Sequence, residues 1–394
     1  MKIHRQFLKM ATLTVVAVMA VLLVSAQAQQ NLVYINANIL TPGGNGVIAL
    51  VNDGAGNMSP LPGSPYASLG TGVGGDGNPL DDAQWDSDQE LVINSAGTLL
   101  LSVNGGSNNL SSFTINADGT LTRNGAPVAS AGTQPASIGY RDNALGNGVS
   151  LMVVANKDSD PNQTQTAPNY MAFKVSAGGV ISPGAGSPVT LPVGSSPAQV
   201  LMLKSGPPMF FGVQFLGKNV SSYTFTRTGI MSQANSLALP AAAVGGVFHP
   251  TLRQFYLTTP PISSINVMAY DKNGVITKVG NAHNQGLAVC WVAVNKAATR
   301  LYSAETLSGT MSVYDITNSK KPVQLQHIAV SGTGALPTHT RLDPTEKFLY
   351  ILDRLGVLHV FDVLADGTVA ENHAPYNLGL PTGTVPLSVV PLLK

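Results

Sequence analysis

Short runs of apolar or alternating residues, separated by glycine-rich turns, recur along the whole chain. The clearest unit covers residues 91–121 and reads as strand, glycine turn, strand, Gly/Asn loop, strand, tight hairpin and short strand. Its hairpin contains Asp118 and Gly119, a pair that suits a two-residue turn because both central positions need a positive φ. The pattern therefore predicts four consecutive antiparallel strands joined by short turns.

The same order of elements recurs at intervals of 44 to 60 residues, after a looser first copy from Val33 to Gly54. The turn residues that mark the other copies are Gly119, Gly179, Gly229, Gly274, Asn318 and Gly367. Seven such units predict an all-β fold, a seven-bladed β-propeller with four-stranded antiparallel blades. Runs 32–36 and 387–393 would bring strands from both chain ends into one blade and close the ring. Two β-sandwich domains are the alternative, which the uninterrupted period disfavours.

The N-terminus has the pattern of a targeting segment. Basic residues precede an apolar run over residues 10–24, and small residues suited to a signal peptidase follow it. We therefore expect residues 1–28 to be a cleaved signal peptide and residues 29–394 to be a single propeller domain, periplasmic or secreted. A retained anchor helix is the alternative, although the run is shorter than the ~20 residues that span a bilayer. No later stretch of the sequence is apolar enough to span a membrane.

Composition narrows the classes of function. The chain is 10% charged, with 21 Lys plus Arg, 20 Asp plus Glu and one Cys among 394 residues. Loss of Lys2, Arg5 and Lys9 with the signal peptide leaves 18 basic and 20 acidic residues, a formal charge of −2. This balance gives no basic footprint for nucleic acid, and a lone Cys290 excludes a disulfide scaffold or a multi-Cys zinc module. We expect a monomer that does not bind nucleic acid.

Several of the repeated units carry a further signature. Residues 95–104 read Ser-Ala-Gly-Thr-Leu-Leu-Leu-Ser-Val-Asn, and residues 343–353 read Asp-Pro-Thr-Glu-Lys-Phe-Leu-Tyr-Ile-Leu-Asp. These units resemble the repeat of the lactonase-type seven-bladed propellers, a family that includes bacterial 6-phosphogluconolactonase and the carboxymuconate-cyclising enzymes. Surface proteins with a Y-V-T-N repeat are similar too. The resemblance implies a propeller that hydrolyses or forms a small acidic lactone without a cofactor. The alternative is a non-catalytic propeller, at the cell surface or in the periplasm, that binds a protein or a glycan.

Equivalent residues at the start of each innermost strand would form a ring around the central channel. The residue two positions after a recurring proline is Ser137, Gln199 or His339, and we expect the corresponding residues of other blades to be Glu90, Gly245 and Trp291. In the lactonase-like enzymes this position often holds a His preceded by an Arg, whereas here only His339 remains and no Arg-His pair is kept. We take Glu90, Gln199 and Trp291 from this ring as candidate binding residues.

A second set of polar residues stands at the end of the following strand. Its members are Asn104, Asn156, Gln214, Glu305 and Asp353. Such residues commonly cap a strand end and hydrogen-bond a neighbouring loop, which is what we expect of the amides. Glu305 and Asp353 are carboxylates, so they are also candidates for a catalytic and a binding role, respectively.

Opening a lactone needs a base that activates water and a donor for the carbonyl oxygen. The candidate catalytic residues are His339 as the base, Glu305 as the carboxylate that orients it or shuttles a proton, and Arg341 as the ligand of an acidic substrate group. His339 and Arg341 alternate along one predicted strand, so both can face the same side. The alternative for His339 is a structural histidine that is hydrogen-bonded near the start of a strand.

Residues 76–90 form the densest acidic cluster of the sequence. The acidic residues are Asp76, Asp81, Asp82, Asp86, Asp88 and Glu90. We expect a solvated loop between the first two blades and no bound metal. Calcium coordination by these carboxylates is the alternative, although their spacing does not match an EF-hand loop. Trp85 in this loop would either stack on a sugar or anchor the loop by burial.

Overall fold

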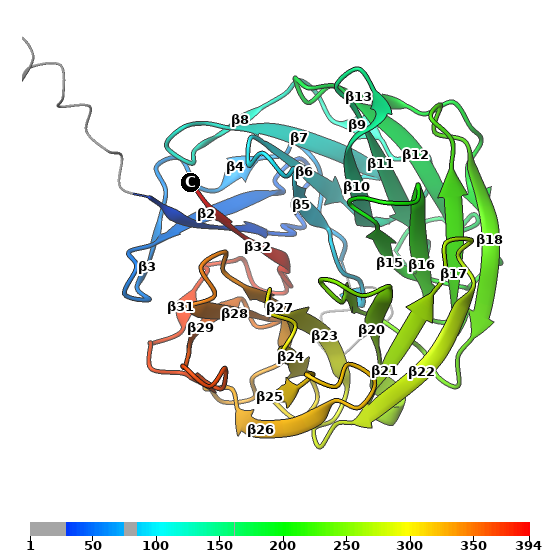
Figure 1. Cartoon of the computed structure of the whole chain (residues 1–394). Coiled ribbons are helices and arrows are strands. Elements are labelled where there is room, and N and C mark those ends of the chain that lie inside the picture. Colours follow the sequence, from blue (N-terminus) through cyan, green and yellow to red (C-terminus); the bar gives the residue numbers. More distant parts are fainter. Residues whose placement is uncertain (1–28, 75–84, 161) are drawn as a thin grey trace, which may run out of the picture. The chain divides into compact units, whose positions relative to one another are not determined.

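The computed structural model describes residues 29–74, 85–160 and 162–394. Within them, residues 31–394 form one compact unit of seven antiparallel sheets arranged as blades around a common axis (Figure 1). Each blade has four strands in a row, and four of the blades add a short fifth strand. The predicted signal peptide, residues 1–28, and the acidic residues Asp76, Asp81 and Asp82 lie outside the described residues.

The blades follow one another along the chain, and the strands of each blade are named from the innermost outward. Blade 1 contains β32 (Leu387–Leu393), β1 (Asn31–Asn36), β2 (Gly46–Asn52), β3 (Met58–Pro60) and β4 (Tyr66–Ala67). Blade 2 contains β5 (Leu91–Ile93), β6 (Leu99–Asn104), β7 (Asn109–Ile115), β8 (Leu121–Arg123) and β9 (Val128–Ala129). Blade 3 contains β10 (Pro135–Gly146), β11 (Val149–Asn156), β12 (Asn169–Val175), β13 (Ile181–Pro183) and β14 (Val189–Thr190).

The remaining four blades repeat this arrangement. Blade 4 contains β15 (Pro197–Met202), β16 (Met209–Gln214), β17 (Asn219–Phe225) and β18 (Met231–Ala238). Blade 5 contains β19 (Gly246–Phe248), β20 (Gln254–Thr259), the 3-10 turn η1 (Pro260–Ile262), β21 (Ser264–Tyr270) and β22 (Ile276–His283). Blade 6 contains β23 (Val289–Val294), β24 (Arg300–Glu305), β25 (Thr310–Asp315) and β26 (Val323–Ala329). Blade 7 contains β27 (Pro337–Leu342), β28 (Phe348–Asp353), β29 (Val357–Val363), β30 (Val369–Ala370) and β31 (Tyr376–Asn377).

Blade 1 joins the N-terminal and C-terminal strands. β1 pairs antiparallel with β32 in a register that sets Leu32 opposite Leu392 and Ile35 opposite Val389. Each innermost strand also contacts the innermost strands of the two neighbouring blades, so the ring is closed. The predicted all-β seven-bladed propeller and its closure by the terminal strands are therefore confirmed.

The hydrophobic cores lie between neighbouring blades. In β11, Met152 and Val154 pack against blade 2, while Leu151 and Val153 pack against blade 4. Side chains alternate between the two faces of a strand, so a sheet that is buried on both faces needs apolar residues at successive positions. This requirement explains the continuous apolar runs of the sequence.

The hairpins that mark the repeat lie between the third and fourth strands of a blade. Gly119 has a φ of 83° and donates its N–H to the carbonyl of Asn116, and Gly274 has a φ of 86° and donates its N–H to the carbonyl of Asp271. A residue with a side chain adopts this left-handed conformation only at a cost, which is why glycine marks the turn.

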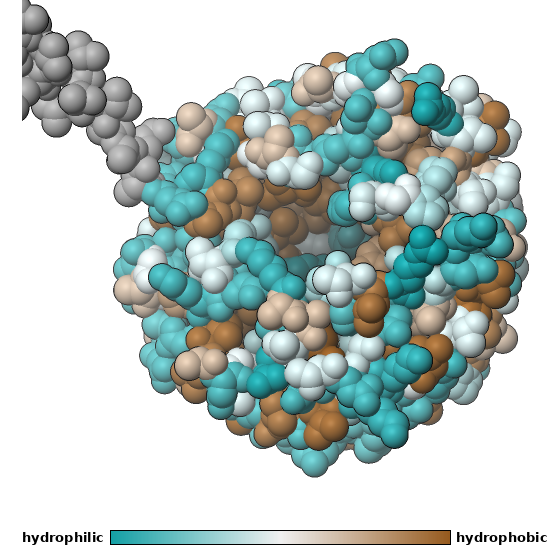
Figure 2. Space-filling view, in the orientation of Figure 1, coloured by the Kyte–Doolittle hydropathy of each residue, from teal (hydrophilic) through white to brown (hydrophobic). Residues whose placement is uncertain are grey.

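Figure 2 shows the ring hollowed near its centre, with hydrophobic residues on part of the wall and many hydrophilic residues on the surrounding face. No helix among the described residues is both long and apolar enough to cross a membrane.

Candidate functional site

A buried segment, residues 85–90, occupies the centre of the propeller just before β5. Its backbone binds two innermost strands, because Asp88 N–H donates to the carbonyl of Ala198 and Ile138 N–H donates to the carbonyl of Gln89. Asp86, Asp88 and Glu90 are each at most 2% exposed. The interpretation of this part of the acidic loop as solvated is therefore wrong, since its carboxylates turn into the ring. We call residues 85–90 the central segment.

Bulges at the start of several innermost strands direct side chains toward this segment. The register shifts between Pro135 and Ser137 in β10, and between Pro197 and Gln199 in β15. The same irregularity occurs before Trp291 in β23 and around His339 in β27. A bulge breaks the regular alternation and re-aims the following side chain. The recurring proline in the sequence thus marks the point where an innermost strand departs from regular pairing.

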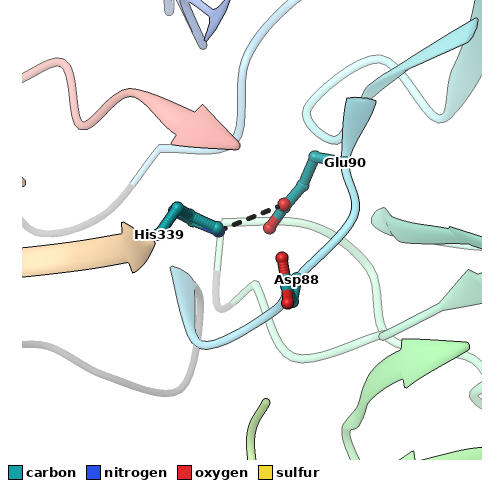
Figure 3. Close-up of side chains that lie close together, drawn as sticks. All are labelled: Asp88, Glu90 and His339. Carbon is teal, nitrogen blue, oxygen red and sulfur yellow. Dashed lines mark ion pairs between the residues drawn. The ribbon is translucent and has the colours of Figure 1, made fainter. Parts of the chain in front are cut away.

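The central segment meets His339 through a carboxylate (Figure 3). The Nε2 atom of His339 lies 3.3 Å from Oε2 of Glu90 and 3.1 Å from the carbonyl oxygen of Ser87. Both neighbours accept hydrogen bonds, so the proton of the neutral imidazole belongs on Nε2. The Nδ1 atom is buried and has no hydrogen-bond partner among the described residues. His339 is therefore oriented through one nitrogen and keeps a lone pair on the other.

Glu90 is held in its charged form. Burial by itself raises the pKa of this carboxyl, but the facing His339 and hydrogen bonds from His339, Ser388 and Ser87 outweigh burial and hold the pKa below its ordinary value. Ser388 Oγ donates to Oε2 of Glu90 over 2.6 Å and accepts the backbone N–H of Glu90 over 2.9 Å. Ser87 Oγ donates to the other carboxylate oxygen over 2.5 Å. Glu90 is thus a fully buried carboxylate with a donor on each oxygen.

Asp88 is bound by two of the residues that the sequence singled out. Arg341 Nη2 lies 2.5 Å from Oδ1 of Asp88, and Gln199 Nε2 donates to Oδ2 over 3.0 Å. Gln199 is itself fixed, because its Oε1 accepts the N–H of Gly246. The Arg341 side chain is 25% exposed, whereas Asp88 is 1% exposed. The structure therefore brings Arg341 and Gln199 together around a carboxylate of the protein itself.

Asp86 carries the second ion pair of the central segment. Arg354 Nη2 lies 2.6 Å from Oδ1 of Asp86, and Lys157 Nζ donates to the carbonyl of Asp86 over 2.6 Å. Burial lowers the pKa of Lys157 to about 8, although the charges of Asp86 and Glu90 oppose this shift. Three carboxylates of one short segment are thus compensated by three basic side chains from other parts of the ring.

Trp291 is fully buried beside the histidine. Its Nε1 donates to the carbonyl of Ser87 over 2.8 Å, and the centroid of its ring lies 4.8 Å from that of His339. Trp291 therefore confines the imidazole on one side and fixes the same carbonyl that accepts from His339.

Glu305 and Asp353 lie in other surroundings. Glu305 accepts hydrogen bonds from Asn284 and Thr310, and burial raises its pKa despite these bonds. Asp353 accepts the N–H groups of two residues in adjoining loops, Leu336 and Leu355. Within the described residues, neither carboxylate has a hydrogen bond to His339 or Arg341. The carboxylate that faces His339 is Glu90, and not Glu305 as the sequence pattern predicts.

Asp88, Glu90 and His339 are the residues in the described part of the chain that offer a possible metal-binding set. One ligand atom from each lies within 4.8 Å of the others. Arg341 and Gln199 already occupy the oxygens of Asp88, and two serines donate to Glu90. A divalent cation would have to displace these donors and would stand close to three basic side chains, so the residues do not fit a resident metal.

A cleft of about 380 Å³ opens next to the central segment. Its lining includes Trp85, Arg354, Asn377, Thr382 and Thr384. Trp85 is 2% exposed and packs with Val73, Val385 and Leu387, so it anchors the segment by burial and does not present a stacking face.

Sequence reasoning missed three partners of this site: Lys157, Arg354 and Ser388. A signal for Ser388 was present, because it stands two residues after Pro386 just as His339 stands two residues after Pro337. Lys157 and Arg354 each follow the last residue of a second strand, directly after Asn156 and Asp353. No local pattern distinguishes them from surface cations.

We compared the chain with protein-family models, with curated sequences and with solved structures. Residues 254–381 match the model of the family "Lactonase, 7-bladed beta-propeller". No curated protein sequence matches the chain. Among solved structures, the periplasmic gluconolactonase PpgL of Pseudomonas aeruginosa superposes with a TM-score of 0.71 at 15% identity, over 93% of this chain and 99% of that one. A proposed 6-phosphogluconolactonase from Bacteroides fragilis gives 0.70 at 12% identity, over 93% and 99% of the two chains.

At these identities the structural likeness establishes the fold alone. The sequence match lies within blades 5 to 7, which hold Trp291, His339 and Arg341. The lactonase-family match over residues 254–381 agrees with the resemblance that the repeat indicated, and the chain folds as a closed seven-bladed β-propeller.

Proposed function

We propose that this chain is an exported hydrolase that opens a small lactone, with His339 as the general base. One observation carries the proposal: Glu90 and the Ser87 carbonyl hold His339 through Nε2, while Nδ1 has no partner among the described residues. A base needs a lone pair and a fixed orientation, and a buried carboxylate on the opposite nitrogen stabilises the imidazolium that forms.

The reaction follows from this arrangement. His339 Nδ1 takes a proton from water while the water oxygen attacks the lactone carbonyl. The bond between the carbonyl carbon and the ring oxygen then breaks, and the imidazolium returns its proton to that oxygen. The product is the open hydroxy acid. Glu90 stays ionised throughout and compensates the positive charge of His339 in the intermediate.

The route to His339 passes Arg341. The His339 side chain is 1% exposed, while Arg341, two residues further along β27, is 25% exposed. Among the basic side chains paired with Asp86 and Asp88, Arg341 is the most exposed. We infer that a substrate enters from the Arg341 side and that its carbonyl reaches His339 after local side-chain movement.

The test is hydrolysis of a lactone panel by the mature protein, beginning at residue 29, beside His339→Ala. We expect kcat/KM to fall about 10²- to 10⁴-fold in this variant, the range that general-base catalysis contributes. His283→Ala is the matched control, since His283 is an exposed residue at the end of β22. Equal rates for wild type and His339→Ala, or no hydrolysis by the wild type, would contradict the proposal.

One observation favours a second candidate, a non-catalytic propeller that binds a protein or a glycan. Asp86, Asp88 and Glu90 are all engaged inside the ring, and such a closed network would hold a propeller together without any reaction. If wild type opens none of the lactones, this candidate replaces the first. The N-terminal targeting pattern supports a periplasmic or secreted location for either one.

A further inference from the structure

The carboxylate of Asp88 is bound in the way that a protein binds an anionic ligand. Its two oxygens meet two different side chains, the guanidinium of Arg341 and the amide of Gln199. Those side chains come from blades 7 and 4, and the carboxylate comes from the segment before blade 2. Charge-assisted contacts of this kind are about twice as strong as neutral hydrogen bonds. Arg341 is thus already engaged by an internal carboxylate.

The other two basic side chains of the site, Arg354 and Lys157, cannot replace Arg341 as the binding group for an anionic ligand. Arg354 pairs with Asp86 at 2.6 Å, and Lys157 donates to the Asp86 carbonyl. Both side chains are at most 2% exposed. The three carboxylates Asp86, Asp88 and Glu90 equal in number the three basic side chains Lys157, Arg341 and Arg354. A ligand that entered along Arg341 would therefore meet an electrically balanced surface with Asp88 next to the only exposed cation of the network.

We propose that Asp88 is a specificity-determining residue that restricts the site to lactones without an acidic group. The proposal rests on the proposed lactone hydrolysis and names its substrate class. It differs from the expectation of an acidic substrate, which assumed that Arg341 is free to bind one.

The physical reason is the environment of the pair. A carboxylate or phosphate brought to Arg341 would lose its hydration and approach the buried charge of Asp88, so repulsion adds to the cost of desolvation. An uncharged, hydroxyl-bearing lactone loses only hydrogen bonds with water, which amide and hydroxyl groups can replace. Asp88 therefore lowers the affinity for acidic lactones and leaves that for neutral ones nearly unchanged.

The experiment removes the internal charge. Asp88→Asn keeps the shape of the side chain and frees the charge of Arg341. Wild type and variant are assayed with gluconolactone and 6-phosphogluconolactone, which share a ring and differ in the phosphate. We expect wild type to prefer gluconolactone, and the variant to raise the ratio of kcat/KM for the phosphorylated over the neutral lactone by about tenfold or more. Asp118→Asn, in an exposed Asp-Gly hairpin, is the matched control and leaves the ratio unchanged.

A binding measurement separates this inference from the proposed reaction. Calorimetry with the open product 6-phosphogluconate needs no turnover. We expect Asp88→Asn to gain about tenfold or more in affinity for 6-phosphogluconate, and the added change Arg341→Gln to abolish that gain. If no lactone is hydrolysed but this gain appears, the proposed reaction fails and the role of Asp88 stands.

Two results would overturn the role of Asp88. One is a wild type that hydrolyses the phosphorylated lactone as fast as the neutral one. The other is a folded Asp88→Asn variant with neither an altered preference nor an increased affinity for 6-phosphogluconate. Should Asp88→Asn not fold, because its amide nitrogen would face the donor of Gln199, Asp88→Ser removes the charge without adding that conflict, and the same two results apply to it.

Discussion

Ser388 offers a direct test of how the ring holds its central segment. It lies at the bulge in β32, opposite the irregularity between Ile35 and Asn36, and is 1% exposed. Its hydroxyl accepts the backbone N–H of Glu90 and donates to the carboxylate of the same residue. Ser388→Ala removes both contacts and adds no volume.

The expected loss of stability follows from those two contacts. A buried N–H without a partner costs about 1–3 kcal/mol, and a hydrogen bond to a charged group contributes about 1.5–3 kcal/mol. Both losses fall on Glu90 and are not independent, so we expect a total of about 3–4 kcal/mol. With an unfolding entropy of about 2.1 cal/mol/K per residue, the domain of residues 29–394 then loses roughly 4–5 °C in Tm.

The assay is urea unfolding at neutral pH together with a thermal melt. Ser137→Ala is the matched control, because Ser137 holds the equivalent position in β10, is fully buried and accepts the N–H of Val200 at 3.0 Å. We expect this control to lose about 1–2 kcal/mol. If Ser388→Ala is no less stable than Ser137→Ala, Ser388 does not support Glu90 in the way that we argue.

Two further predictions concern charged groups of the same site. Glu90→Gln should lower kcat about 10²-fold by weakening the support of the imidazolium. Because folding lowers the pKa of Glu90, its contribution to stability is present above the ordinary value of 4.5 and is lost as the pH falls through the folded value, so urea unfolding should show the deficit of Glu90→Gln shrinking in acid. Folding lowers the pKa of Lys157 from 10.5 to about 8, so wild type should gain roughly 3 kcal/mol over Lys157→Met as the pH rises across that interval. If the difference in free energy of unfolding between wild type and Lys157→Met, measured with urea, does not change between about pH 8 and 10.5, burial does not lower the pKa of Lys157 as described.

Much of the fold is predictable from short stretches of sequence. The Asp118-Gly119 hairpin is set by local features, the positive φ of Gly119 and the hydrogen bonds that the Asp118 side chain accepts from Thr120, and apolar runs indicate strands that are buried on both faces. Repetition of these local signals predicts the number of blades. The sharing of one blade by the two terminal strands is predictable for the same reason, since closing the ring uses a strand from each end of the chain.

The repeat also locates part of the candidate site. His339, Gln199 and Trp291 occupy equivalent positions relative to a strand start, so aligning the repeated units is enough to predict that all three lie near the axis. The same alignment includes Ser388 once the last strand is treated as a blade start. It does not determine which residue each of them touches.

Those contacts depend on tertiary structure. Glu90 and His339 are separated by almost 250 positions in the sequence and meet only because closing the ring brings blades 2 and 7 to the same axis. Glu305 shares the strand-end pattern of the amides, but it hydrogen-bonds Asn284 in the connection between blades 5 and 6. The position of a residue in its strand determines where its side chain leaves the backbone, but the packing of the neighbouring blades determines which residues that side chain contacts.

The acidic segment shows most clearly which features the sequence predicts and which depend on the tertiary structure. By sequence, Asp86 and Asp88 look like a solvated loop, because isolated carboxylates are costly to bury. They become buried because Arg341 in β27 and two residues that follow strand ends, Lys157 and Arg354, converge on them. The sequence by itself determined the blades and the ring, since these arise from local periodicity. The tertiary structure alone decided which charges are compensated, since compensation depends on distances between residues that are remote along the chain.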